Sequence, residues 1–392
     1  MLRHLAVIVA LAVLACGTAT AEPTRPSDDD LVLATVPAGE AAAAPDLRQA
    51  EADLSRDSKN LTLALRLARL AIEQGRTWSD PRRYGEAQAA LSPWWSTAHP
   101  PEEVLILRAV IEQALHDFSA ALSDLGAVLQ SPPRNGQPRL TRAFVRMVVG
   151  DITGAADDCL RLPLAVGRLT IAACRARVAA LSGSGEEAYD RLSRLMAREG
   201  GENQAIHRFL LFILADIAEG IGRTEDADRH FTEAAAIGAP DVPLLAAMAD
   251  HLLDRNQPAD VLKLLDGKGE ADVLVLRRAI AAKRMRDPLL AQWSAMLNER
   301  FAAATAGRVR THLREEARFR LEVEGDSAAA LRLAIENWAI QKEIADARLL
   351  LECAIAAGRP ESAADVVRHV RATGLIDKRV TPYLSRLGDR IP

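Results

Sequence analysis

Aromatic side chains are scarce in this sequence of 392 residues. Phe, Trp and Tyr together make up 4% of it, although hydrophobic residues as a whole make up 49%. Alternating runs of β-branched residues are also missing, so nothing in the pattern favours a β-sheet. A helical protein in which Ala, Leu and Arg are prominent is what this composition indicates.

The sequence has no excess of basic charge. It contains 49 Lys and Arg against 53 Asp and Glu, a formal net charge of −4. Nucleic acids and anionic membrane surfaces attract proteins with a positive field, so we expect no nucleic-acid partner. Beyond the amino-terminal segment, no stretch is long and uncharged enough to span a bilayer, and we expect no transmembrane segment.

Motifs that carry catalysis or bind cofactors are absent as well. The sequence has no His-Glu-x-x-His, no Cys-x-x-Cys, no phosphate loop and no Gly-x-Ser-x-Gly. The nearest approach to a metal pair is His312 followed by Glu315 and Glu316, but the second histidine of an inverted zinc motif is missing. We therefore expect no enzymatic activity, no cofactor and no metal.

What the sequence does contain is a periodic alanine. Consecutive members are 34, 34, 33, 39, 32, 32, 39 and 33 residues apart, and the nine are Ala87, Ala121, Ala155, Ala188, Ala227, Ala259, Ala291, Ala330 and Ala363. The mean spacing is about 34.5 residues, the length of a repeat made of two helices. This period predicts an all-α solenoid.

A second alanine stands twelve residues before six of these positions, at Ala109, Ala143, Ala176, Ala215, Ala247 and Ala279. Two antiparallel helices approach closely where both carry a small side chain, so each pair predicts a helical hairpin. Turn residues lie between the paired alanines, for example Gly150-Asp151, Gly222-Arg223 and Asn256-Gln257-Pro258.

The unit from Ala215 to Ala239 shows the pattern best. Ala215, Gly222, Ala227 and Phe231 match the small residue, the turn and the Ala-x-x-x-aromatic motif of the tetratricopeptide repeat family, which the chain resembles over roughly residues 60 to 375. The resemblance implies a solenoid of about nine helix-turn-helix repeats. It also implies a non-catalytic scaffold that binds a protein or peptide on the concave face lined by the first helix of each repeat.

In this family, side chains next to the small residue of the first helix point into the groove. On this chain the resemblance selects Phe144, Arg177, Phe212, Asp216, Met248 and His251 as partner-binding residues. Packing between neighbouring first helices is the alternative role of each. Trp94 and Trp95 form a second candidate patch, or else they cap a neighbouring interface.

The amino terminus resembles a secretory signal. Arg3 and His4 precede an apolar stretch from Leu5 to Ala15, and a small-x-small cleavage site ends at Ala21. We expect a signal peptide over residues 1–21 and an exported, periplasmic protein. Leu14-Ala15-Cys16-Gly17 is similar to a lipobox, so the alternative is a chain lipidated at Cys16. The alternative function is a structural or assembly factor of the bacterial cell envelope, held near a membrane by a lipid on Cys16 or by a membrane-associated partner.

The mature chain divides into two parts. Residues 22–45 have no apolar stripe and are predicted to be a flexible leader, and residues 46–392 are predicted to form the solenoid with terminal capping helices. Cys159 and Cys174 fall on helices expected to lie side by side in successive repeats. Since an exported chain meets oxidising conditions, they are candidates for a disulfide; otherwise they are two small buried hydrophobic residues.

Overall fold

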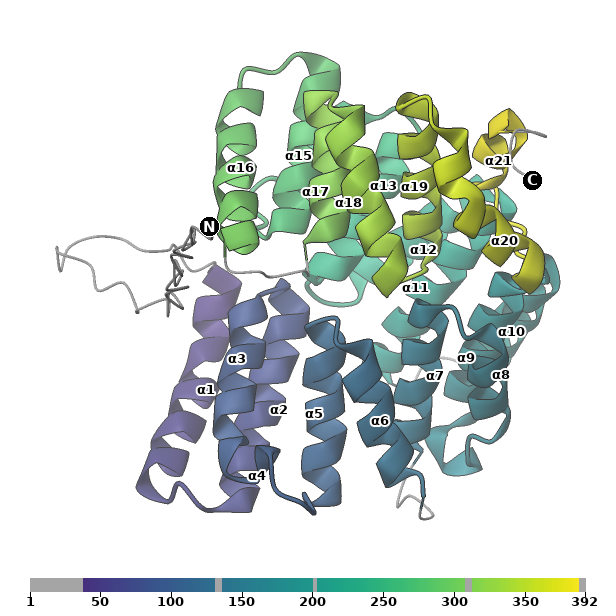
Figure 1. The fold of residues 1–392 in the computed structure, drawn as a ribbon. Helices are drawn as coiled ribbons and strands as arrows, with labels where there is room; N and C mark the ends of the chain where they lie inside the picture. Colours follow the sequence, from purple (N-terminus) through teal and green to yellow (C-terminus); the bar gives the residue numbers. More distant parts are fainter. Residues whose placement is uncertain (1–37, 131–135, 200–202, 307–311, 388–392) are drawn as a thin grey trace, which may run out of the picture. The chain divides into compact units, whose positions relative to one another are not determined.

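Helices account for all the regular secondary structure in the part of the chain that the structure describes. The computed structural model describes residues 38–130, 136–199, 203–306 and 312–387, and these ranges contain no β-strand (Figure 1). Residues 37–392 form one unit by their internal contacts. The predicted all-α class is confirmed.

Nine pairs of antiparallel helices follow one another along this part of the chain. The first helices are α2 (Leu61–Trp78), α5 (Glu102–Ala114), α7 (Gln137–Val149), α9 (Arg168–Leu181), α11 (Gln204–Ile221), α13 (Val242–Asp254), α15 (Asp272–Met285), α17 (Leu313–Phe319) with η2 (Arg320–Glu324), and α19 (Ile344–Ala356). The second helices are α3 (Pro81–Ala90), α6 (Phe118–Val128), α8 (Ile152–Leu160), α10 (Gly185–Glu199), α12 (Thr224–Ala236), α14 (Pro258–Leu265), α16 (Leu290–Ala306), α18 (Ser327–Ile340), and η3 (Pro360–Ala363) continuing into α20 (Ala364–Thr373). Four further elements are α1 (Ala38–Arg56), α4 (Ser92–Trp95), η1 (Leu164–Val166) and α21 (Thr381–Leu387).

The turns within the pairs use the residues that the sequence indicates. Gly150 ends α7 with a left-handed φ of 83°, and the Asp151 side chain accepts the Gly154 N–H at 2.8 Å to begin α8. The same device recurs at Gly325-Asp326, where Asp326 caps α18. A left-handed residue satisfies the last carbonyls of one helix, and the carboxylate satisfies the first N–H groups of the next.

The alanine register holds in most repeats but shifts in two. Ala259 and Ala291 are exposed, whereas the other seven alanines of that series are at most 6% exposed. In the sixth pair Ala249 and Val261 are fully buried; they are again twelve apart but two positions later than predicted. In α16 the buried side chains are Leu297 and Phe301. Valine takes the place of alanine at the sixth crossing, so a search for alanine alone misses it.

The amino-terminal boundary also differs from the prediction. The first helix begins at Ala38 and not at residue 46, so the last part of the predicted leader is helical. From Asp46 onward it packs on α2, and its Leu47 and Ala50 are buried. The helix therefore covers the open side of the first repeat, as a capping helix does. The predicted signal peptide and Cys16 lie outside the described residues.

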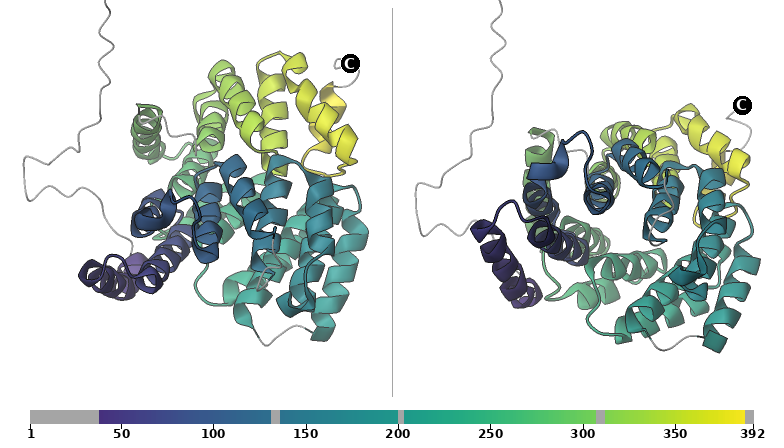
Figure 2. Two further views of the ribbon diagram at one scale, coloured as in Figure 1. Left: turned by 60° about the horizontal axis from the view of Figure 1, so that its bottom comes forward. Right: turned by 90° about the horizontal axis from the view of Figure 1, so that it is seen from below.

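Successive pairs turn, so repeats that are far apart in sequence meet (Figure 2). Helix α2 of the first pair contacts α13 of the sixth. The Lys342 N–H, before α19, donates to the carbonyl oxygen of Val148 in α7 at 2.7 Å. The concave side of the central repeats is thus partly covered by the carboxy-terminal repeats.

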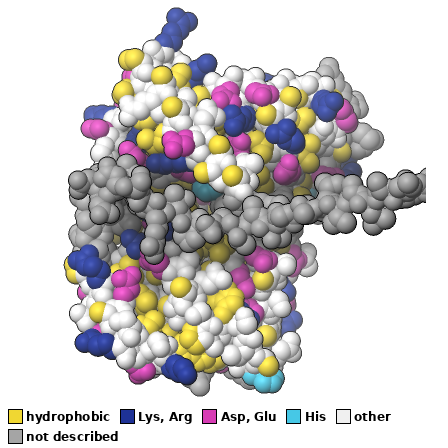
Figure 3. Space-filling view, turned by 60° about the vertical axis from the view of Figure 1, so that its left-hand side comes forward, with side chains coloured by type: hydrophobic (Ala, Val, Ile, Leu, Met, Phe, Trp, Pro, Cys, Tyr) yellow, Lys and Arg dark blue, Asp and Glu magenta, His cyan; other side chains and the backbone are white. Residues whose placement is uncertain are grey.

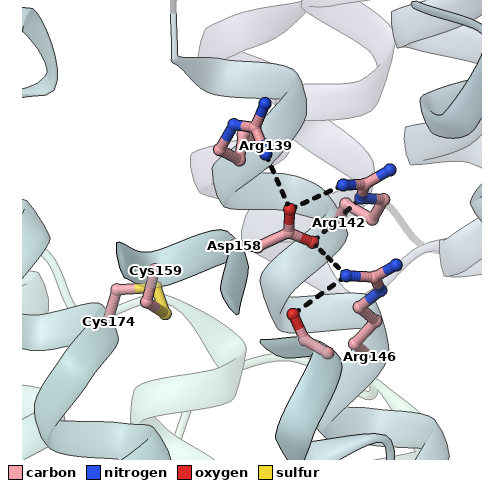
Figure 4. The surroundings of a disulfide bond; sticks show 7 residues. Arg139, Arg142, Arg146, Asp158, Cys159 and Cys174 are labelled. Carbon is pink, nitrogen blue, oxygen red and sulfur yellow. Dashed lines mark hydrogen bonds and ion pairs between the residues drawn. A yellow bond between two sulfur atoms is a disulfide. The ribbon is translucent and has the colours of Figure 1, made fainter. Parts of the chain in front are cut away.

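A covalent bond joins the third and fourth pairs (Figure 4). Cys159, in α8, is disulfide-bonded to Cys174 of α9, and their Cα atoms are 5.7 Å apart. Next to it the fully buried carboxylate of Asp158 binds three arginines of α7, which are Arg139, Arg142 and Arg146. The bond and the ion-pair cluster together fix α7, α8 and α9 relative to one another.

Candidate functional site

The concave face is built from one stripe of side chains on each first helix. Phe144 of α7, Arg177 of α9 and Asp216 of α11 each follow the buried alanine of their helix by one position. In α13 the buried alanine is Ala249, so the equivalent residue is Asp250. The sequence reasoning missed Asp250 because it used Ala247 as the reference; the buried pair Ala249 and Val261 is the signal that identifies it.

The carboxy-terminal halves of α9 and α11 carry a network of ion pairs. Arg177 contacts the Asp216 carboxylate, which also binds Arg379 at 2.8 Å. One turn later on α11, Glu219 binds Arg379 at 3.2 Å. We call Asp216, Glu219 and the carbonyl of Gly220 the acidic seat.

His251 lies between two carboxylates and does not face open solvent. Its Nδ1 is 2.9 Å from Glu219 and its Nε2 is 2.9 Å from Asp228, and the residue is 5% exposed. Burial by itself would lower the pKa of His251, but the hydrogen bonds and charges of the two carboxylates raise it above its ordinary value. Only the charged imidazolium can donate through both nitrogens at once. His251 therefore ties α13 to α11 and α12.

Two other predicted residues take part in packing. Phe212 and Met248 are partly buried and pack against the hydrophobic cluster of α9 to α13, which includes Leu210 and Leu244. A partner role for Phe212, Met248 and His251 stays a prediction.

A segment of the chain itself covers the charged part of the concave face. Residues 375–380, between α20 and α21, are called the strap here. The strap contains Arg379, which occupies the acidic seat, and Lys378, whose N–H donates to the Gly220 oxygen at 2.7 Å. The carboxy-terminal half of the groove is thus filled.

Exposed apolar side chains lie in the amino-terminal half of α11, next to Phe144 of α7. The rings of Phe144 and Phe209 meet edge to face with centroids 6.1 Å apart. Phe209 and Ile206, both on α11, are each 37% exposed. We call Phe144, Ile206 and Phe209 the aromatic ledge.

The ledge and the acidic seat lie on one face of α11. Phe209 precedes Asp216 by seven residues, which is two helical turns and about 10 Å along the axis. The sequence reasoning selected Phe212 and missed Phe209. The seven-residue spacing from Asp216 is the signal that would have identified it.

Further along the concave side, a cavity of about 170 Å³ lies among α13, α15, α17 and α19. Its wall carries arginines and carboxylates together with Leu276, Ile344 and Leu349. Asp250 contacts both Arg277 and Arg318, and although partial desolvation opposes them, these two guanidinium groups lower its pKa to about 2. Arg348 is held by Asp254 and Glu352 in the same way. These charges neutralise one another and support the packing of the repeats.

Trp94 and Trp95, the other patch selected from the sequence, lie in the short helix α4. Both are partly buried against the core of the first repeat, and the Arg108 guanidinium lies 5.7 Å from the Trp95 ring centroid. The two tryptophans therefore lie at the interface between the first and second repeats.

The described residues contain no group of His, Cys, Asp and Glu side chains suited to holding a metal ion. None of the helices seen here has both the length and the apolarity needed to cross a membrane. On the face in Figure 3, basic and acidic side chains are interspersed and do not form a patch of one sign.

Nine helix pairs decide the fold: each has a left-handed residue in its turn, and seven have a buried alanine of the predicted series on the second helix. The chain folds as a tetratricopeptide-like solenoid. No protein-family model matches the sequence, and no curated protein does.

Solved structures similar to this solenoid are helical-repeat proteins. They include Cut9 in the APC/C hetero-tetramer Cut9-Hcn1, with 15% identity, a TM-score of 0.44, and coverage of 90% of this chain and 73% of that one. A Rap protein complexed with competence and sporulation factor has 12% identity, a TM-score of 0.41, and coverage of 89% and 99%. Yeast Tom70 has 9% identity, a TM-score of 0.30, and coverage of 88% and 95%.

Proposed function

We propose that this solenoid is an exported, non-catalytic scaffold that binds a segment of another protein on the concave face of α7, α9 and α11. The observation that carries the proposal is the aromatic ledge: Ile206 and Phe209 are each 37% exposed, and the Phe209 ring meets that of the partly buried Phe144, beside the part of the groove that the strap fills. Aromatic side chains supply much of the binding energy at protein interfaces, and neighbouring charges orient the partner.

Two features support export. The sequence of residues 1–21 has the organisation of a signal peptide, and disulfides such as Cys159–Cys174 persist in oxidising compartments. The periplasm fits both features. The second candidate is a lipid-anchored or membrane-associated factor of the cell envelope, which the lipobox-like sequence at Cys16 favours.

Binding is tested by capturing partners from the native envelope with the wild-type chain and measuring the affinity of the captured protein. Phe209→Ala should weaken binding by about 2 kcal/mol or more, which is roughly thirtyfold, with little change in melting temperature. Leu289→Ala is the matched control, because Leu289 is also exposed, at 47%, but lies outside α7, α9 and α11. If Phe209→Ala and Phe144→Ala both bind the partner as the wild type does, the ledge is not the site.

Localisation is tested separately by mass analysis of the mature amino terminus. A chain that begins at Glu22 supports the free periplasmic scaffold, whereas an acylated Cys16 as first residue supports the anchored factor.

A further inference from the structure

The strap is held to α11 by main-chain and side-chain contacts that resemble those of a bound peptide. The Lys378 N–H bonds to the Gly220 oxygen at 2.7 Å, and the Arg379 guanidinium donates to Asp216 at 2.8 Å and to Glu219 at 3.2 Å. Asp377 accepts from Arg379 at 2.7 Å and thereby orients its guanidinium group. The strap and α11 are far apart in the sequence: Arg379 is 163 residues from Asp216 and 160 residues from Glu219.

Gly220 shows that α11 is adapted to the strap. It lies inside the helix, where glycine weakens helix formation, and its backbone does not need a positive φ. A Cβ at this position would lie 2.6 Å from the Asp377 Oδ2 atom, closer than real Cβ contacts. At the neighbouring repeat, a Cβ on Gly183 would lie 2.3 Å from the Gly374 oxygen. Close approach of the strap accounts for the missing side chain at Gly220.

The occupied seat shows which chemistry it accepts. The Arg379 guanidinium group lies between Glu219 and Asp216, which Arg177 also contacts, and the Lys378 N–H meets a helix carbonyl. Arginine suits such a site because its donors form a planar fork that binds two acceptors together. The strap therefore serves as an example, inside the molecule, of a ligand for the acidic seat.

We propose that the strap is an internal ligand and that the partner displaces it with an arginine of its own. The partner segment would place a large apolar residue on the aromatic ledge and an arginine on the acidic seat. Ledge and seat are about 10 Å apart, which an extended chain covers in about three residues. The apolar part of this inference rests on the proposed function; the arginine part rests on the strap alone.

The first experiment measures hydrogen exchange of the strap amides in the full-length chain. Gly220→Ala should increase exchange at Lys378 at least tenfold, because the added methyl group displaces Asp377. Gly126→Ala is the matched control, since Gly126 is inside α6 and a Cβ there would meet nothing within 4 Å. Unchanged protection at Lys378 in Gly220→Ala would show that α11 is not a dedicated seat.

The second experiment supplies the strap as a separate molecule. A fluorescent peptide with the sequence of residues 374–384 is titrated into the full-length Asp377→Ala/Arg379→Ala variant, in which the strap is weakened and α11 is intact. We expect this peptide to bind at least tenfold tighter than the same peptide with alanine at position 379, and to lose that advantage when Asp216→Ala is added. Binding of the two peptides within twofold of each other would overturn arginine recognition.

Circular dichroism tests whether the double variant is folded. If it is unfolded, the exchange experiment on Gly220→Ala still tests whether α11 is adapted to hold the strap. Neither experiment needs the unidentified partner. A failed pull-down therefore leaves the strap result standing, and a failed strap experiment leaves the aromatic ledge to be tested by the pull-down.

Discussion

Single residues stabilise this solenoid through charges that are shielded from solvent. Asp158 has no exposed surface and accepts hydrogen bonds from three arginines of the neighbouring helix (Figure 4). Its neighbour Asp157 instead forms an exposed pair with Arg161. Burial makes the difference, because a buried ion loses solvation that only its partners replace.

We predict that Asp158→Ala lowers the free energy of unfolding by about 3 kcal/mol, because it leaves several guanidinium groups without their carboxylate. Asp157→Ala should cost less than about 1 kcal/mol, as exposed pairs do. Urea denaturation of the two variants measures both values. Equal losses would show that the cluster around Asp158 contributes no more than a surface pair.

His251 makes stability depend on pH. Since the pKa of His251 is raised in the folded protein, its contribution is complete below the ordinary value of 6.5 and is lost as the pH rises through the folded value. The groups around the ring are Glu219, Asp228, Arg255 and Phe231, with Arg379 on the far side of Glu219.

We therefore predict that the wild type loses stability between pH 6 and pH 9 and that His251→Gln loses less, because glutamine cannot carry the charge. Denaturant midpoints at the two pH values test this. If stability changes with pH by the same amount in the wild type and in His251→Gln, His251 does not change protonation in this range.

Among the helices in the described part of the chain, α8 and α9 are joined by a covalent bond. Cys159 and Cys174 are separated by 15 residues. Closing a loop of that size stabilises a fold by about 3 kcal/mol in the chain-entropy account. The third cysteine of the described chain, Cys353, is buried, and burial raises the pKa of its thiol to about 12, so it should stay unreactive in the native state.

We predict that a reducing agent lowers the stability of the wild type by about 3 kcal/mol. The variant Cys159→Ser/Cys174→Ser should already have this lower stability and should not respond to the reductant. Thermal unfolding of both proteins with and without dithiothreitol measures whether each one responds to reduction. A wild type that does not respond would show that the bond adds no stability.

At the scale of the whole chain, contacts between distant repeats set this solenoid apart from a simple stack in which each repeat touches only its neighbours. Arg348 of the ninth pair donates two hydrogen bonds, of 2.5 and 2.7 Å, to Asp254 at the end of the sixth pair's first helix. The strap connects the carboxy-terminal end to the fifth pair in the same manner.

We predict that Arg348→Met costs about 2 kcal/mol, between the loss expected for an exposed ion pair and that for a fully buried one, because this bidentate pair is partly buried. The loss should appear as earlier unfolding of the carboxy-terminal repeats, seen as faster amide exchange in α19 to α21. Arg371→Met is the control, because Arg371 is exposed and forms no ion pair with the described residues. Uniform destabilisation of all repeats would contradict this account.

The sequence by itself determined the helical class, the pairs and their turns. These depend on local rules: a small residue at most crossings, a left-handed residue after the first helix and, in several pairs, a capping carboxylate before the second. It also predicted the burial of Ala143, Ala176 and Ala215, the alanines that precede Phe144, Arg177 and Asp216. It failed at the sixth crossing, where Val261 replaces the expected alanine and Asp250 takes the groove position.

Only the tertiary structure decided which part of the groove is open. The turn of the stack brings Arg379 to Asp216 and Arg348 to Asp254, pairs that are 163 and 94 residues apart. No local periodicity encodes such contacts, because they depend on the small rotation from each repeat to the next, summed over several repeats. As a result of this accumulated rotation, the strap occupies the acidic seat, and Ile206 and Phe209 of the aromatic ledge stay exposed.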